Sequence, residues 1–116
     1  MKTAIFTTAL VMTLSAFAWA QPKYECKLLL EDNKGAFSIE MDKKELPVAP
    51  KAFVDLKGNQ SELYRVVINE DGRFLQILNM DLETHKIDVN TVVSTDAKMI
   101  TSVNTFWSYA ISCVRQ

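Results

Sequence analysis

One histidine and two nearby carboxylates are the first residues whose types and spacing could support chemistry. Asp81, Glu83 and His85 alternate along the segment DLETHK, so their side chains would share a face in an extended strand. Two carboxylates and an imidazole can bind zinc or a related metal. The same residues are equally typical of an exposed hairpin loop, with His85 at a left-handed position. We therefore treat this trio as a weak metal candidate and expect no cofactor.

The sequence indicates no catalytic residue. A nucleophile-base pair would have to be built around His85, and the chain contains no G-x-S-x-G turn. The carboxylate pairs Glu31/Asp32 and Glu70/Asp71 flank predicted turns, where they stay solvated instead of being enclosed in a cleft. We expect a protein that is not an enzyme.

The two cysteines, Cys26 and Cys113, predict a structural disulfide. They do not form a C-x-x-C pair, and too few companion ligands are present for a metal site. The bridge would enclose nearly the whole domain, and a loop of this length gives about 4.6 kcal/mol in the chain-entropy model.

Residues 1–20 have the form of a cleaved secretory signal peptide. Lys2 precedes an apolar run that is too short to span a membrane, and small residues at Ala18 and Ala20 mark a cleavage site. We expect a single β-rich domain over residues 21–116, exported to the periplasm or secreted, in a bacterium. After cleavage no membrane insertion is expected.

The charges argue against nucleic acid as a partner. The formal net charge is −1, and acidic and basic residues are interspersed without a basic stripe or block.

Alternation of apolar and polar residues dominates the chain and predicts strands. The expected inward-facing sets come from five segments, namely Tyr24, Cys26, Leu28 and Leu30; Phe37, Ile39 and Met41; Tyr64, Val66 and Ile68; Ile87, Val89, Thr91 and Val93; and Trp107, Tyr109, Ile111 and Cys113.

Glycines and prolines punctuate these strands. Gly35, Gly58 and Gly72 lie in polar stretches where tight turns would use a positive φ. Pro47 and Pro50 predict a loop or edge crossing. The segment 94–104 fits either a short helix or a strand.

The expected fold is all-β, a small antiparallel barrel or sandwich of seven to eight strands, with the first and last strands joined by the disulfide. If those strands are antiparallel neighbours, the meander can close on itself, so the barrel is our preferred interpretation.

A candidate binding surface combines an aromatic side chain with a proline-containing loop. Phe106 alternates with residues predicted to be buried, so we expect it to be exposed, near a loop that contains Leu46, Pro47, Val48 and Pro50. A rigid stapled scaffold of this kind suits a binding or inhibitor-type module with a protein or glycan partner. The alternatives are a self-assembling envelope or adhesion component and, third, a small enzyme.

Overall fold

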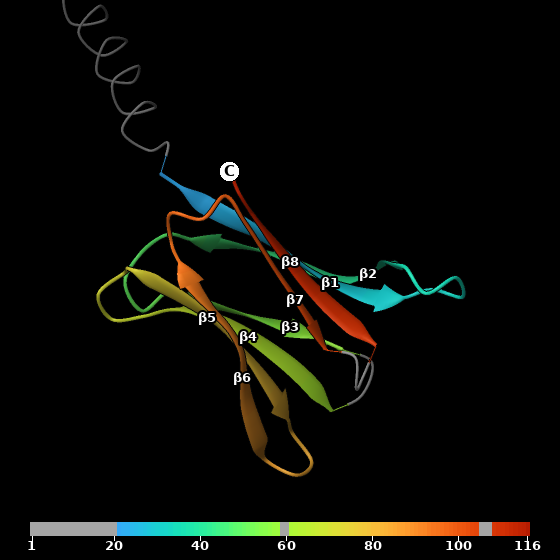
Figure 1. Ribbon diagram of the computed structural model, residues 1–116. Helices are drawn as coiled ribbons and strands as arrows, with labels where there is room; N and C mark the ends of the chain where they lie inside the picture. The colour runs from blue at the N-terminus through green and yellow to red at the C-terminus, as the bar shows by residue number, and fades with distance from the viewer. Residues whose placement is uncertain (1–20, 59–60, 105–107) are drawn as a thin grey trace, which may run out of the picture.

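The computed structural model describes residues 21–58, 61–104 and 108–116, which form eight antiparallel strands and no helix (Figure 1). The predicted signal peptide and Phe106 lie outside the described residues. The strands are β1 (Lys23–Glu31), β2 (Phe37–Pro47), β3 (Phe53–Lys57), β4 (Glu62–Ile68), β5 (Phe74–Asp81), β6 (Lys86–Ser94), β7 (Met99–Asn104) and β8 (Tyr109–Arg115).

The strands form two four-stranded sheets that enclose the core between them. Sheet A has the order β2-β1-β8-β7, and sheet B has the order β3-β4-β5-β6. Alternation predicts the inner face correctly in the central strands, because Tyr24, Cys26 and Leu28 of β1 are fully buried. In β4, Val66 and Ile68 are buried in the same way. The fold is therefore a sandwich whose core comes from both inner faces.

The preferred interpretation of a closed barrel is wrong. The first and last strands are antiparallel neighbours, as the sequence predicts, but no backbone ladder joins β2 to β3 or β6 to β7. At the first of these seams, side chains replace the ladder. The Lys44 Nζ donates to the Asp55 carbonyl oxygen at 2.5 Å, and the Lys57 amide donates to Asp42 Oδ2 at 3.0 Å.

A β-bulge changes which residues of β6 face the core. Ile77 of β5 pairs with Thr91, but the next residue, Leu78, pairs with Val89, so Asn90 is an extra residue. One extra residue reverses the facing of every side chain beyond it. Ile87 and Val89 consequently lie outside, with 61% and 55% of their surface exposed, although the sequence predicts them inside.

The turns fall where the sequence predicts them, but one glycine has a different role. Gly35 and Gly72 adopt φ of 83° and 74°, which favours glycine. Gly58 has no such φ; a Cβ there would lie 3.0 Å from the hydroxyl oxygen of Tyr109. Close packing therefore explains Gly58. The segment 94–104 forms a turn followed by β7 and contains no helix.

Candidate binding surface

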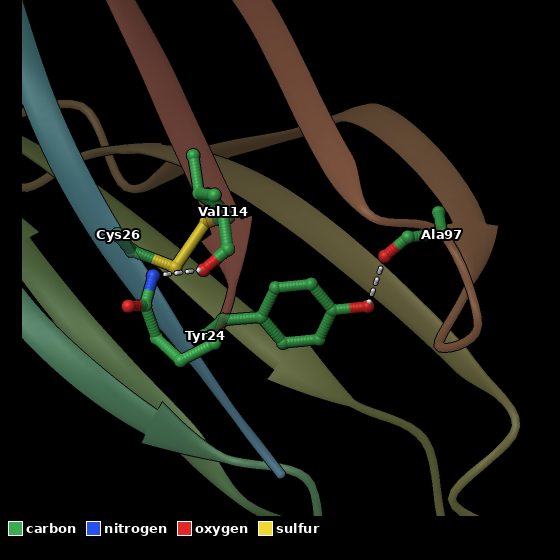
Figure 2. The surroundings of a disulfide bond; sticks show 6 residues. Tyr24, Cys26, Ala97 and Val114 are labelled. Carbon is green, nitrogen blue, oxygen red and sulfur yellow. Dashed lines mark hydrogen bonds between the residues drawn. A yellow bond between two sulfur atoms is a disulfide. The ribbon is translucent and has the colours of Figure 1, made fainter.

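The disulfide fixes the centre of sheet A. Cys26 and Cys113 are directly opposite on β1 and β8, with Cα atoms 4.0 Å apart, and both are fully buried. The predicted bridge is confirmed. Figure 2 shows Tyr24 beside it, with the ring directed from β1 towards the loop between β6 and β7. The Tyr24 hydroxyl lies within hydrogen-bonding distance of the carbonyl oxygens of Thr95 and Ala97, at 2.6 and 2.9 Å.

The loop after β2 presents less surface than the sequence predicts. Leu46 is fully buried opposite Tyr24 in the β1–β2 ladder, so its side chain belongs to the core. Val48 is half-buried, and its amide donates to the carbonyl oxygen of Pro22 at 3.0 Å. Pro47 and Pro50 are exposed. Of the four residues expected there, only the two prolines are fully available to a partner.

The weak metal candidate is not assembled. Asp81 ends β5, and residues 82–85 form a turn, so the alternation that would align Asp81, Glu83 and His85 is broken. Asp81 Oδ1 instead accepts the amide of Glu83 at 2.9 Å, and this bond contributes most to lowering the pKa of Asp81. His85 is exposed with φ of 58°, the left-handed position that the sequence predicts. Within the described ranges, no group of three His, Cys, Asp or Glu residues could hold a metal.

Five of the ten exposed large apolar side chains among the described residues lie on the outer face of sheet B. We call it the exposed sheet face and define it by the residues of β3 to β6 whose side chains point away from the core. Its exposed members are Phe53, Phe74, Ile87, Val89 and Val92, each 48–61% accessible. Val67, Leu78 and Met80 lie between them and are half-buried.

Strand register makes this face continuous across sheet B. In one row, Phe53 pairs with Val67, Val67 with Gln76, and Gln76 with Val92. In the next row, Leu78 pairs with Val89. Figure 1 shows no further layer over this side of the sheet. A contiguous apolar patch of this kind marks an interaction site more often than scattered apolar residues do.

Gln76 and one ion pair interrupt the apolar side chains. Arg65 donates from Nε and Nη2 to the two carboxylate oxygens of Asp55, at 2.7 and 3.0 Å. The hydrogen bonding of Arg65 to Asp55 is the largest influence on the guanidinium and raises its pKa, so Arg65 stays charged. Its Cζ also lies 4.5 Å from the ring centroid of Phe53. The pair is held in place by bidentate geometry and by the ring, and it gives the face one oriented polar group.

Two buried polar atoms inside the sandwich have no partner among the described residues. They are the hydroxyl oxygen of Tyr64 and the Oδ1 of Asn79, which belong to residues paired across β4 and β5. The Tyr64 ring packs edge-on against Tyr109, with centroids 5.7 Å apart. Burial, which is the main influence, raises the pKa of Tyr64, so the phenol stays protonated and does not serve as a base.

Sequence reasoning missed both the exposed sheet face and the buried Asn79. The signal for Asn79 is an amide at an inward position of LQILNM. The signal for the face is a second apolar set, Phe74, Leu78 and Met80, at the alternate positions of the same strand. A strand that is apolar on both faces indicates either burial in three layers or a docking surface.

Comparison with known proteins gives no match, since no family model, curated protein or solved structure is significantly similar to the chain. The disulfide suggests an oxidising, exported environment. In the part of the chain that the structure describes, no helix is long and apolar enough to cross a membrane.

Proposed function

We propose that this protein is an exported, non-enzymatic binding module that recognises a protein partner through the exposed sheet face. One observation carries the proposal. Five large apolar side chains of sheet B are about half-accessible and lie on one uncovered face, where Phe53 and Val92 share a row across the sheet. Covering them would remove apolar surface from water, which is the dominant favourable contribution to most protein associations.

The chemistry of the face favours a protein over a glycan. Most of its exposed and half-buried members are aliphatic, and aliphatic side chains offer no hydrogen bonds to sugar hydroxyls. The Arg65–Asp55 pair supplies a fixed charged group next to Phe53, as is common in protein interfaces where an apolar centre is combined with an oriented arginine. The stapled sheet beneath supplies rigidity, which lowers the entropic cost of binding.

Capture experiments with matched variants test the proposal. The full-length chain, tagged at its C-terminus, is expressed in its own host and cross-linked in the envelope and secreted fractions. Phe53→Glu and Phe74→Glu each place a charge in the exposed sheet face. Val103→Glu places the same charge on the outer face of sheet A, at a valine with a similar accessibility of 47%.

We expect a partner protein that is captured by the wild type and by Val103→Glu but lost with both phenylalanine variants. Each substitution is at a half-exposed position, so folding should be retained, and far-ultraviolet circular dichroism checks this. Equal capture by all four proteins, or equal loss in all three variants, would contradict recognition by this face.

A further inference from the structure

We propose that the free edge of β6 pairs with β6 of a second copy of this chain, joining the two B sheets into one antiparallel sheet of eight strands. This inference goes beyond partner recognition, because it concerns the edge of sheet B and not its face. It rests on three properties of β6, namely an edge without a ladder partner among the described strands, a length of nine residues without proline or adjacent lysines, and compatibility with itself in an antiparallel register.

The first property is an unpaired row of backbone groups. β6 is the last strand of sheet B, and within the described ranges β5 is its one ladder partner. The amide of Thr95 donates to the Arg73 carbonyl oxygen at 2.9 Å. Because ladder hydrogen bonds alternate along an antiparallel pair, Val93 and Thr91 also bond to β5, and Val92 and Ser94 direct their N–H and C=O groups away from it. The Ser94 carbonyl oxygen accepts the Ala97 amide at 3.1 Å, which leaves the Ser94 N–H and both groups of Val92. Those groups are available to another strand.

The second property is that β6 has neither the adjacent lysines and proline nor the short length of the other edge strands. The edge features that it does have are the bulge at Asn90 and the charges of Lys86 and Asp88. β2 carries two adjacent lysines and ends at Pro47, while β3 has only five residues; side-chain hydrogen bonds also cover the seam between these two strands. β7 has six residues. β6 has nine, contains no proline, and exposes three β-branched apolar side chains. Its hairpin with β5 projects away from sheet A (Figure 1).

The third property is self-compatibility. A two-fold axis between Asn90 and Thr91 sets Val89 opposite Val92 of the second copy, so both outward valines gain a cross-strand apolar neighbour. The bulge at Asn90 falls on this axis, and the side chains on either side of it therefore stay in phase. Lys86 and Asp88, the two charged residues of β6, then lie opposite uncharged residues. No like charges meet, and the exposed sheet faces of the two copies become continuous.

A proline substitution distinguishes the contribution of the backbone N–H to dimerisation from that of the side chain. Val92→Pro removes an N–H that faces the free edge while leaving the ladder to β5 intact, and edge strands tolerate proline at such positions. Val103→Pro is the matched control on β7. The Arg115 amide donates to Lys98, so by the same alternation Val103 has a free N–H, and its side chain is similarly exposed. Val92→Thr keeps the N–H and the shape of the side chain.

Sedimentation velocity of the full, disulfide-bonded protein over a range of concentrations is the measurement. We expect the wild type, Val103→Pro and Val92→Thr to dimerise reversibly, and Val92→Pro to raise the dissociation constant about tenfold or more, since both copies lose ladder hydrogen bonds. A monomeric wild type would overturn the proposal. So would dimerisation that Val92→Pro leaves unchanged, or that Val103→Pro weakens equally.

Amide exchange of the wild type keeps the test decisive if Val92→Pro does not fold. Residue-resolved hydrogen exchange should show that the amides of Val92 and Ser94 become protected as concentration rises. Fast exchange at every concentration would exclude pairing at this edge. A monomer would leave recognition by the exposed sheet face standing, because Phe53 and Phe74 test that face and lie outside β6.

Discussion

The hydroxyl of Tyr24 lies 2.6 Å from the carbonyl oxygen of Thr95, and this hydrogen bond joins β1 of sheet A to the loop that leaves sheet B. The guanidinium of Arg115 donates to the same oxygen, also at 2.6 Å. Residues from the first strand, the last strand and the crossing loop thus meet at one carbonyl. This contact holds the two sheets together on the side where no ladder joins β6 to β7.

Two buried tyrosines should respond oppositely to loss of the hydroxyl. Tyr24→Phe removes a donor to buried carbonyl oxygens and should lower the free energy of unfolding by about 1 kcal/mol. Tyr64→Phe removes a buried hydroxyl that has no partner in the described chain, and stability should stay equal or rise by up to about 1 kcal/mol. Urea unfolding of both variants measures the difference, and equal losses would contradict the assigned hydrogen bonds.

Alkaline pH should destabilise the protein through the same two tyrosines. Burial is the main cause that raises the pKa of Tyr24 and Tyr64 above 10.0. The unfolded chain releases the phenol protons at a lower pH than the folded chain does. The stabilisation that comes from the raised pKa values is therefore fully present below about pH 10, and it is lost as pH rises through the folded pKa values. Thermal midpoints should fall above pH 10, and by less in Tyr64→Phe. An identical fall in the variant would show that Tyr64 is not responsible.

Removal of the disulfide should cost much of the net stability. Cys26 and Cys113 are 87 residues apart, so the chain-entropy model gives up to about 4.6 kcal/mol for the double substitution to alanine. The β1–β8 ladder remains, and the fold should persist at reduced stability. The shift in the urea midpoint between oxidised wild type, reduced wild type and the double variant tests this. A midpoint that does not move would mean that the bridge adds nothing to stability.

The hydrogen bonds of Asp32 in the turn between β1 and β2 should make the free energy of unfolding fall at low pH. Asp32 accepts hydrogen bonds from the Ser38 hydroxyl at 2.6 Å and from the amides of Ala36 and Lys34, and the first of these contributes most to lowering its pKa below 3.8. Its contribution is complete above about pH 3.8 and is lost as pH falls through the folded pKa.

Asp32→Asn should therefore flatten the loss of stability below pH 4, measured by thermal unfolding. Asp71→Asn, at an exposed carboxylate in the β4–β5 turn, is the control and should keep the wild-type slope. The prediction would be refuted if both variants behaved alike.

The strands that sequence reasoning places correctly are those with one register and one buried face. Tyr24, Cys26 and Leu28 are predicted from alternation alone, and the disulfide follows from the number of cysteines. The facing of Ile87 and Val89 is predicted wrongly because a bulge adds a residue without leaving a mark in the alternation. The local sequence pattern shows that side chains alternate between the two faces of a strand. Which of the two sets faces the core depends on the pairing with the neighbouring strand.

The difference between barrel and sandwich has a similar origin. A closed meander and this sandwich share the same strand order, the same hairpins and the same β1–β8 pairing. They differ only in whether two pairs of edges approach closely enough for ladder bonds, and this depends on twist and on side chains such as Lys44 and Asp42 at the β2–β3 seam. The burial of Leu46 could not be predicted for the same reason. Its pairing with Tyr24 in the β1–β2 ladder places its side chain in the core.

The pairing of the first strand with the last has a consequence for the order of synthesis. Sheet B is a run of consecutive hairpins and can assemble as soon as its residues leave the ribosome. Sheet A is incomplete until the final strand arrives, so the thiol of Cys26 waits for nearly the entire chain. With two cysteines there is only one bridge within a chain, and no shuffling is needed to find it. The hazard during that wait lies between neighbouring chains, whose unpaired thiols can join two unfinished molecules.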